Sequence, residues 1–223
     1  CFAKGENFGR SIIYKGEHAE LDDIQSVGIK NPIKIEKKSK LKLLFPFPNF
    51  ILNNFSIRLF NKYFFFKNRF NKNKVLSYHD YFYPLDFLNN WNLMYGKKGF
   101  VQYQFVLPEK NSFHGLKDVL KKINQYNLPP FLTVLKLMGK KSIGTMSFPM
   151  PGYTLALDFP IRKGTYELLD ALDKIIIKNN GRIYLAKDNR VSKEKFHQMY
   201  ENEIKSFISS NNYRSLQSER VEI

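Results

Sequence analysis

Polar side chains suited to ligand binding interrupt four otherwise apolar segments of this chain. Gln102 and Gln104 stand in GFVQYQFVLP, Lys136 in PFLTVLKLMG, Asp158 in YTLALDFPI and Lys187 in GRIYLAKD. The two amides offer donors and acceptors that suit hydroxyls or the edge of a heterocycle. A lysine is a compact charge that suits phosphate, and it is seldom buried unless it meets an anion or a carboxylate. These residue types predict a polar ligand site, in which Asp158 could pair with either lysine.

Six predicted elements must position these residues, in the order strand, helix, strand, strand, helix, strand. In chain order they cover residues 99–108, 112–126, 130–139, 153–161, 164–180 and 181–188. This is the split βαβ order, βαββαβ, which folds as an antiparallel sheet with both helices on one face. We therefore expect an α+β domain.

The strand residues divide between the two faces of the predicted sheet, because successive residues of a strand point to opposite sides. One face is polar, and its members are Gln102, Gln104, Val134, Lys136, Thr154, Ala156 and Asp158. The other face is apolar and can bury the helices, and its members are Tyr103, Phe105, Leu135, Leu137, Leu155, Leu157 and Phe159. The polar face is predicted to be the floor of a site. Simple solvation of one face of an antiparallel sheet is the alternative.

The composition predicts a folded and strongly basic protein. Apolar residues make up 43% of the 223 residues, which is enough for a core. The formal net charge of +16 predicts a polyanionic partner, namely nucleic acid, phospholipid or a phosphorylated substrate. The abundance of Lys, Asn, Ile and Phe together is equally typical of an AT-rich genome. No zinc-finger spacing or aromatic RNP strand occurs, so we predict no nucleic-acid partner.

Several other kinds of site are excluded. Cys1 is the single cysteine, which excludes an internal disulfide and a cysteine metal site and favours a reducing compartment. The four histidines lack metal-ligand spacing, so we predict no metal. Neither a Gly-rich phosphate loop nor a GxSxG elbow is present. The sequence shows no signal peptide and no apolar run long enough to span a membrane, and we expect a cytoplasmic protein. The start, without Met, predicts a piece of a longer chain.

A basic and aromatic segment, residues 38–75, precedes the predicted sheet. It interleaves Lys and Arg with Phe, Leu, Ile and Tyr, and Pro46 and Pro48 prevent one continuous helix. A short helix is predicted from Asn53 to Phe66. Such a segment can lie at a membrane interface, with its rings among the headgroups and its basic side chains on the phosphates. That would place the protein peripherally at the inner membrane, and the alternative is that the rings pack on their own domain.

Apolar spacing predicts two further helices. Leu85, Leu88, Trp91 and Met94 or Tyr95 have helical spacing and predict a short helix that docks the tryptophan into a core. Ser192 is a predicted N-cap. The apolar stripe that follows it consists of Phe196, Met199, Tyr200, Ile204 and Phe207.

A series of short motifs also runs along the chain. They are FYPLD (82–86), Trp91–Asn92, Tyr95–Gly96, GFVQYQFVLP (99–108), SFPMPG (147–152), LDFPI (157–161), GRIYLAKD (181–188) and FHQMY (196–200). In this order and spacing they resemble the decaprenylphosphoryl-β-D-ribose 2′-oxidase family of FAD-linked oxidoreductases, which are of the vanillyl-alcohol oxidase type. The segments GRSIIYKGEHA and SLQSERVEI resemble the family as well. The resemblance covers nearly the whole chain and is weakest over 24–75.

The resemblance implies a two-domain flavoenzyme of which this chain is the C-terminal, substrate-binding portion. Residues 1–180 would form the substrate-binding domain, with 37–98 as a lid-like excursion. Residues 181–223 would return to an FAD domain that lies outside this chain and that would hold most of the FAD. The implied reaction is oxidation of the 2′-hydroxyl of a polyprenyl-phosphate pentose to a ketone by hydride transfer to the flavin. An NADH-dependent keto-sugar reductase would be the pathway partner, and this portion alone would be inactive.

Residue by residue, the resemblance implies roles on the polar face. Lys187 would be the catalytic residue, near the flavin and the sugar, and Asp158 would support the site from behind. The residues implied to bind the substrate are Gln102, Gln104, Val134, Lys136, Thr154, Ala156, Phe82, Leu85, Leu88 and Trp91. Ala156, Thr154 and Phe82 stand where actinobacterial relatives carry Cys, Asn and Tyr, so the sugar and the lipid stay open.

Two other functions remain open. One is an aldonolactone oxidase or another alcohol oxidase of the same superfamily. The other is a non-enzymatic basic module that binds lipid or nucleic acid. The residues that discriminate are Gln102, Gln104 and Lys187, because an oxidase requires them to reach one cavity.

Overall fold

The computed structural model separates the chain into two compact units, Cys1–Lys97 and Lys98–Ile223. The residues that the structure describes are 9–29, 31, 41–48, 50–70, 74–83, 86–188, 190–208 and 214–223.

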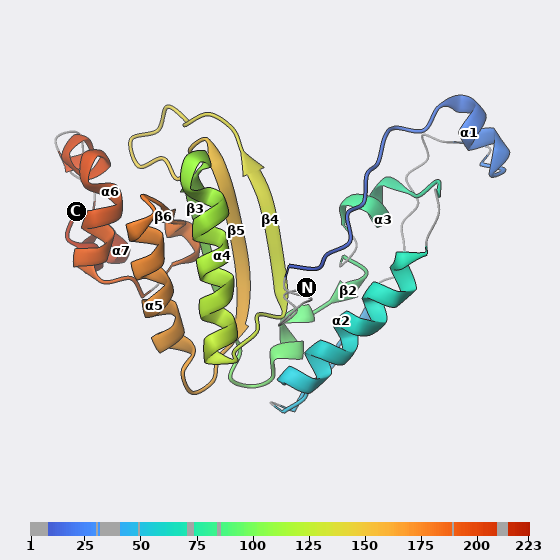
Figure 1. Ribbon diagram of the computed structural model, residues 1–223, viewed down its shortest axis with the longest axis horizontal. Coiled ribbons are helices and arrows are strands. Elements are labelled where there is room, and N and C mark those ends of the chain that lie inside the picture. The colour runs from blue at the N-terminus through green and yellow to red at the C-terminus, as the bar shows by residue number, and fades with distance from the viewer. Residues whose placement is uncertain are drawn as a thin grey trace. The chain divides into compact units, whose positions relative to one another are not determined.

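The second unit is built on a four-stranded antiparallel sheet. Its strands, β3 (Phe100–Pro108), β4 (Leu132–Met138), β5 (Gly152–Pro160) and β6 (Arg182–Ile183), lie in the order β4-β5-β3-β6. Helix α4 (Glu109–Tyr126) links β3 to β4, and α5 (Thr165–Lys178) links β5 to β6. Both helices cover the same face of the sheet (Figure 1). The α+β class and the split βαβ order predicted from the sequence are confirmed.

The alternation of the strands decides which face the helices cover. Opposite pairs such as Tyr103–Leu157 and Phe105–Leu155 lie on the helix side, and all four side chains are buried. Helix α4 meets them with Ser112, Gly115, Val119 and Ile123, and α5 with Leu168, Leu169, Leu172 and Ile176. Each fully buried aliphatic side chain contributes about 2 kcal/mol. The core therefore lies between β3, β5 and the two helices.

Strand β4 departs from this prediction although its faces are assigned correctly. Leu135 and Leu137 lie on the helix side of the sheet, yet they are 55% and 69% exposed. Helices α4 and α5 pack over β3, β5 and β6, whereas β4 is an edge strand beyond them (Figure 1). The expectation that both leucines bury the helices was wrong, because alternation sets the face of a residue but not whether a helix covers it.

The fourth strand is much shorter than the predicted range of 181–188. Pairing with β3 ends at Phe105–Ile183, and the chain then forms a 3₁₀ turn, η3 (Leu185–Lys187). The Lys187 amide donates to the Tyr184 carbonyl at 3.1 Å, which closes this turn. Lys187 therefore does not lie on a strand, as the sequence had suggested, but on a turn at the edge of the sheet.

A glycine fixes the point at which β5 begins against the end of β3. Gly152 has φ +150°, and a Cβ built on it would lie 2.0 Å from the carbonyl oxygen of Leu107. Any larger residue would push the two strands apart. Because β5 is the neighbour of both β3 and β4, this close approach supports the register of three strands.

The C-terminal segment packs on the second unit through two helices, α6 (Lys193–Ile208) and α7 (Leu216–Val221). Phe196 and Tyr200 of α6 are fully buried, and the Tyr200 hydroxyl donates to the Ile183 carbonyl at 2.6 Å. The helix predicted after Ser192 is confirmed, whereas α7 was not predicted. That residues 181–223 also reach a flavin domain stays a prediction.

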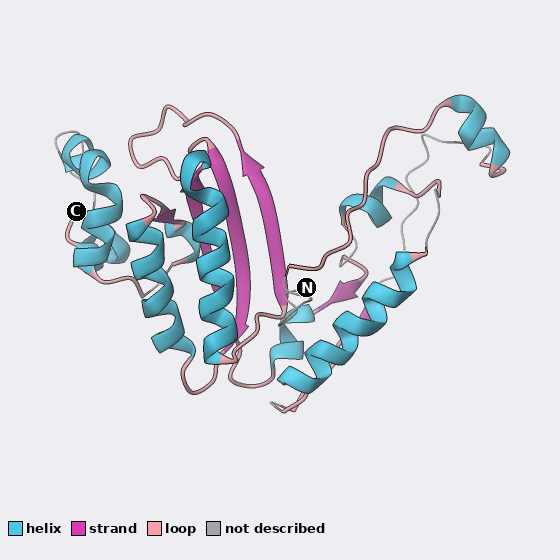
Figure 2. Ribbon diagram, viewed as in Figure 1, coloured by secondary structure: helices cyan, strands magenta, loops and turns pink. Residues whose placement is uncertain are grey.

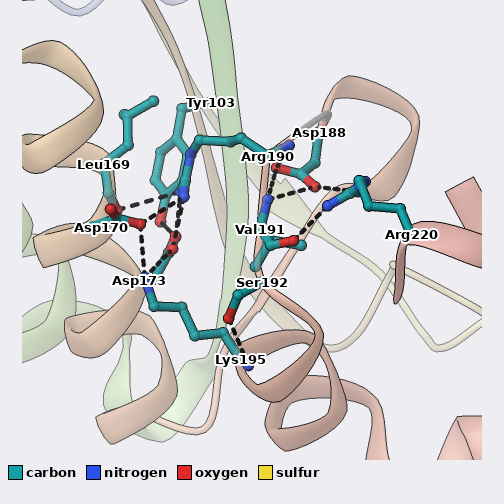
Figure 3. A network of polar contacts seen from close by, with 10 residues as sticks. All are labelled: Tyr103, Leu169, Asp170, Asp173, Asp188, Arg190, Val191, Ser192, Lys195 and Arg220. Atoms are coloured by element: carbon teal, nitrogen blue, oxygen red, sulfur yellow. Dashed lines mark hydrogen bonds and ion pairs between the residues drawn. The ribbon is translucent and has the colours of Figure 1, made fainter. Parts of the chain in front are cut away.

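A buried ionic network joins three elements of this unit (Figure 3). The Asp173 carboxylate on α5 is 0% exposed and accepts from Tyr103 Oη on β3 at 2.9 Å. It also accepts from Arg190 Nη2 at 2.6 Å and from Lys195 Nζ at 3.1 Å. Burial, together with the charge of Asp173, raises the pKa of the Tyr103 phenol well above its ordinary value, so the phenol remains a donor.

The first unit has little regular structure (Figure 2). Its elements are α1 (Leu21–Ser26), β1 (Leu41–Lys42), α2 (Asn54–Arg69), α3 (Tyr78–Phe82), β2 (Leu88–Asn89) and a 3₁₀ helix, η2 (Trp91–Tyr95). Strands β1 and β2 pair in parallel. The helix predicted from Asn53 is confirmed, because Asn53 caps α2 by accepting from the amides of Phe55 and Ser56. Within the described residues, no helix is both long enough and apolar enough to cross a bilayer.

The helix predicted from Leu85, Leu88, Trp91 and Met94 or Tyr95 is wrong at Leu88, whereas Trp91–Tyr95 forms a 3₁₀ helix. Leu88 lies in β2 and Trp91 begins η2, with a left-handed residue, Asn90, between them. Leu85 lies outside the described residues. The apolar spacing was helical, but pairing of β2 with the distant β1 gives Leu88 an extended backbone instead.

We expect Asp173→Asn to lower the free energy of unfolding by about 3 kcal/mol, because it leaves the buried guanidinium of Arg190 without its counter-charge. Urea denaturation of the purified protein measures this. Asp170→Asn is the matched control, since Asp170 pairs with the same two cations but is 59% exposed, and it should cost less than about 1 kcal/mol. Equal losses for the two variants would contradict a special role for the buried carboxylate.

Candidate functional site

A shallow hollow at the edge of the sheet brings together three of the predicted site residues. It is lined by Gln102, Gln104 and Lys187, with Val101, Tyr103, Ile183, Tyr184, Asp188 and Arg190. The hollow opens where β6 ends, because η3 replaces the strand that would have continued along Val101–Gln104. The hollow therefore lies beside the edge of β3, and residues from both faces of that strand line it.

The hollow is too small to be a complete ligand pocket. It is a surface depression that encloses no volume large enough for a water molecule. Pockets that enclose small molecules usually measure about 300–1,000 Å³. A ligand on this face therefore needs a further wall beyond the residues that line the hollow.

Hydrogen bonds behind the hollow fix how the two amides point. Gln102 Nε2 donates to Asp158 Oδ1 at 3.0 Å, and a carboxylate only accepts. Gln104 Nε2 donates to Thr154 Oγ1 at 3.1 Å, and Thr154 Oγ1 itself donates to the Phe105 carbonyl at 2.8 Å. Each amide nitrogen uses one of its two N–H groups in this way. Each glutamine can therefore offer a ligand its amide oxygen as an acceptor and one remaining N–H as a donor, with Lys187 on the same hollow.

The strand register confirms that the predicted polar face is one surface. Across the sheet, Gln104 is opposite Ala156, which is opposite Val134. In the next row Thr154 is opposite Lys136. Lys136 is exposed on β4, two strand spacings or about 10 Å from β3, and it does not line the hollow. One ligand can meet Lys136 and the glutamines only if it bridges that distance.

Two members of the polar face act from behind the glutamines. Asp158 is buried, as its predicted supporting position requires, and it holds the Gln102 amide. Thr154 is only 1% exposed, and both roles of its hydroxyl are taken by Gln104 and the Phe105 carbonyl. The geometry therefore gives Thr154 an indirect role, through the orientation of Gln104, instead of the direct contact expected from the sequence.

The remaining predicted residues belong to the first unit. Phe82 is exposed at the end of α3, Leu88 is half-buried in β2, and the Trp91 ring lies edge-on to the Tyr95 ring at 6.0 Å. The hollow is formed by the second unit alone, so these three residues do not contribute to it. Their role in a substrate wall, and that of Leu85, stays a prediction.

The C-terminal helix α7 braces the turn that carries Lys187. Gln217 Nε2 donates to the Leu185 carbonyl at 3.1 Å, and Arg220 Nη2 donates to Asp188 Oδ2 at 3.0 Å. Asp188 in turn accepts from the amide of Val191 at 3.2 Å, and Arg220 also donates to the Val191 carbonyl (Figure 3). Sequence reasoning missed both α7 residues, and the only signal for them was their place in the motif SLQSERVEI.

The floor of the hollow is rigid because Tyr103 and Arg190 belong both to it and to the buried network. The Arg190 guanidinium stacks over the Tyr103 ring, 5.5 Å from its centroid, and both nitrogen ends bind Asp173. Burial by itself would lower the pKa of Arg190, but its hydrogen bonds to Asp173 outweigh this and raise it. Both Nη groups of Arg190 are bound to acceptors, whereas its buried Nε has no partner among the described residues. Lys187 is the other cationic residue that lines the hollow.

A second ionic cluster secures the loop between β4 and β5. Glu203 Oε1 on α6 accepts from Lys141 Nζ and from Arg182 Nη1, each at 2.9 Å, and Arg182 Nη1 also donates to the Ser147 carbonyl. Burial would raise the pKa of Glu203, but the two cations outweigh burial and lower it. No group of His, Cys, Asp or Glu side chains among the described residues could hold a metal ion.

Comparison with known proteins relates this chain to an oxidase. One relative is the decaprenylphosphoryl-beta-D-ribose oxidase of Mycolicibacterium smegmatis, with 36% identity over 200 residues, which covers 90% of this chain and 43% of that protein. An uncharacterized protein in the mprA 5′ region of Streptomyces coelicolor is 37% identical over 92 residues, or 39% of this chain and 25% of that protein. No family model matches the chain.

The chain is therefore a homologue of a portion of this oxidase and spans less than half of its length. The resemblance stated from the motifs is confirmed. Nothing in the comparison tests the individual site residues, whose roles rest on the geometry of the hollow.

We expect Glu203→Gln to change how stability depends on pH. A carboxyl whose pKa is lowered by folding contributes stability above its unfolded pKa, and this contribution is lost as pH falls through the folded pKa. The wild type should be more stable than the variant by about 1–2 kcal/mol at neutral pH. The gap should close in acid, which thermal melts from neutral to acid pH can follow. Glu201→Gln is the control, because Glu201 forms an ion pair with Lys205 that is 70% exposed on both sides, and its gap to the wild type should be much smaller. A gap for Glu203→Gln that stays constant with pH would contradict the ion-pair assignment.

We expect Arg220→Met to loosen the turn that carries Lys187. The amides of Lys187 and Asp188 donate to the Tyr184 and Leu185 carbonyls within this turn. In the wild type the turn can open only if the ion pair between Arg220 and Asp188 breaks, and the variant lacks that ion pair. Both amides should therefore exchange with solvent deuterium about tenfold faster in the variant. Arg214→Met, at an exposed arginine just before α7, is the matched control. Unchanged exchange in Arg220→Met would show that α7 does not brace the turn.

Proposed function

We propose that this chain is the substrate-binding portion of an FAD-dependent oxidase that converts a sugar hydroxyl to a ketone. The observation that carries the proposal is that Gln102, Gln104 and Lys187 line one hollow at the edge of the sheet. The name of the M. smegmatis relative supports a sugar substrate that carries a polyprenyl phosphate. We assign the 2′-hydroxyl of a polyprenyl-phosphate pentose as the group oxidised.

The donors and acceptors of the hollow match a polyhydroxylated ligand. Gln102 and Gln104 accept from sugar hydroxyls through their amide oxygens and donate to them through the N–H that Asp158 or Thr154 does not take. The Lys187 ammonium donates to the oxygen of the hydroxyl that is oxidised, and it stabilises the negative charge on that oxygen as the hydroxyl proton leaves to solvent. Lys136, at the far edge of the same face, is the partner we assign to the phosphate.

The polar face suits FAD for two reasons, namely its polar groups and the open side of the hollow. Its amides and ammonium suit the edge of a heterocycle, and the hollow needs a further wall that the ring of a flavin would supply. When bound, FAD accepts the hydride from the carbon that bears the hydroxyl. A domain outside this chain would hold most of the cofactor, while this chain would position the sugar on its polar face.

We assign the choice of sugar to the row of the polar face that Gln104, Ala156 and Val134 form. Ala156 lies between Gln104 and Val134, and its short side chain leaves room above the sheet at that point. Thr154 acts on the same row through Gln104. A different alcohol, such as an aldonolactone, remains the competing substrate class. The ketone product would require a reductase that uses NADH as hydride donor.

The test follows anaerobic bleaching of the flavin in the full-length protein on addition of polyprenyl-phosphate pentoses. We expect Lys187→Met to slow bleaching by about 100-fold while FAD remains bound, because removal of one preorganised donor usually costs this much. Lys205→Met, at an exposed lysine of α6, is the matched control and should behave as the wild type. Bleaching at the wild-type rate in Lys187→Met would refute the catalytic assignment, and bleaching only by aldonolactones or simple alcohols would replace the substrate.

A further inference from the structure

Helix α2 packs one face within the first unit and exposes another face that is apolar. The packed face carries Ile57, Asn61, Phe65 and Asn68, which are buried or half-buried. The second face carries Phe55, Leu59, Tyr63, Phe66 and, at the C-cap, Phe70, which are between 47% and 75% exposed. These five residues, which we call the exposed stripe, recur every three or four positions and so form one line along the helix.

Basic residues flank the exposed stripe. At 100° per residue, Arg58, Lys62 and Arg69 lie along one margin of it and Lys67 lies along the other. The helix contains no acidic residue, and residues 38–75 contain nine Lys or Arg and no Asp or Glu. A surface of this kind is complementary in charge to a polyanion and complementary in polarity to an apolar phase.

The helix is well formed by its local chemistry, so the stripe is a continuous surface. The Asn53 side chain accepts from the amides of Phe55 and Ser56, and Lys67 and Arg69 lie in the last turn, where cations favour a helix. Phe60 and Phe64 stack on each other along their own helix, with ring centroids 6.0 Å apart. Soluble monomers seldom expose a contiguous apolar patch of this kind without a partner.

We propose that α2 lies in the plane of a membrane that carries anionic phospholipid. The exposed stripe enters the boundary between headgroups and acyl chains, and the flanking basic side chains meet the lipid phosphates. The mode is peripheral, because α2 is too short and too polar to span a bilayer. The inference does not rest on the proposed oxidation, although it would bring a lipid-linked substrate and the chain to the same surface.

Vesicle flotation of the full-length protein tests whether the basic side chains of α2 contribute to membrane binding. Binding should be weak to phosphatidylcholine, strong with about 30% phosphatidylglycerol, and reversed as salt rises from about 50 to about 500 mM. The triple variant R58Q/K62Q/R69Q should lower the partition coefficient about 100-fold, since each basic side chain at an anionic surface contributes about fivefold. The triple variant K117Q/K121Q/K174Q removes the same charge from exposed positions of α4 and α5 and should lose less than about threefold. Equal losses would show only a general charge effect and overturn the inference.

A second pair of variants tests the apolar term. F55S/F66S should reduce binding at least tenfold, roughly the effect of withdrawing two rings from the interface, with the helix content and melting temperature unchanged. F113S removes an equally exposed ring from α4 and should bind as the wild type. Wild-type binding by F55S/F66S would overturn the inference.

A fluorescence reporter keeps the inference testable if F55S/F66S folds poorly. In F66W the emission should shift to the blue on anionic vesicles and be quenched by brominated lipid, whereas F113W should show neither change. Absence of quenching in F66W would refute insertion, and binding of an oligonucleotide that depends on the stripe, without vesicle binding, would assign nucleic acid as the partner instead. Lys187→Met should bind vesicles as the wild type, which separates this test from that of the oxidation.

Discussion

One buried carboxylate holds the second unit together at the point where the site is built. Asp173 takes a hydrogen bond from Tyr103 on the central strand, and ion pairs from Arg190 after the 3₁₀ turn and Lys195 on α6. A charge buried this completely is stable only while its partners keep their geometry, because the cost of removing it from water is balanced by these contacts alone. The Asp173 carboxylate of α5 therefore holds the sheet, α5 and the C-terminal segment together.

The candidate site lies on the short segment between the end of β6 and the buried ion pair. The chain leaves the sheet after Ile183, and the ion pair of Arg190 with Asp173 brings it back against α5 only a few residues later. That turn carries Lys187 past the edge of β3, beside the part of the strand that bears Gln102 and Gln104. A longer β6 would instead continue its backbone pairing with this part of β3.

The two units contribute different chemistry. The second unit has a closed core, buried ion pairs and a polar face whose amides are held from behind. The first unit buries few apolar residues, and it leaves a row of rings on α2 in solvent with basic side chains beside them. Helix α2 carries four of the chain's basic residues and no acidic one. Part of the net charge is thus placed beside an exposed apolar surface.

By itself, the sequence determined the order of elements, the parity of each strand and the relationship to the oxidase. These features are local or repeat with a fixed period, so the strand alternation alone was enough to assign Gln102, Gln104 and Asp158 to one face. Only the tertiary structure decided that Leu135 stays exposed, that Lys187 sits on a turn and that Arg220 braces it. Each of these depends on contacts between residues far apart in the chain. Periodicity carries information about which way a side chain points, whereas what covers it is decided by how distant elements pack.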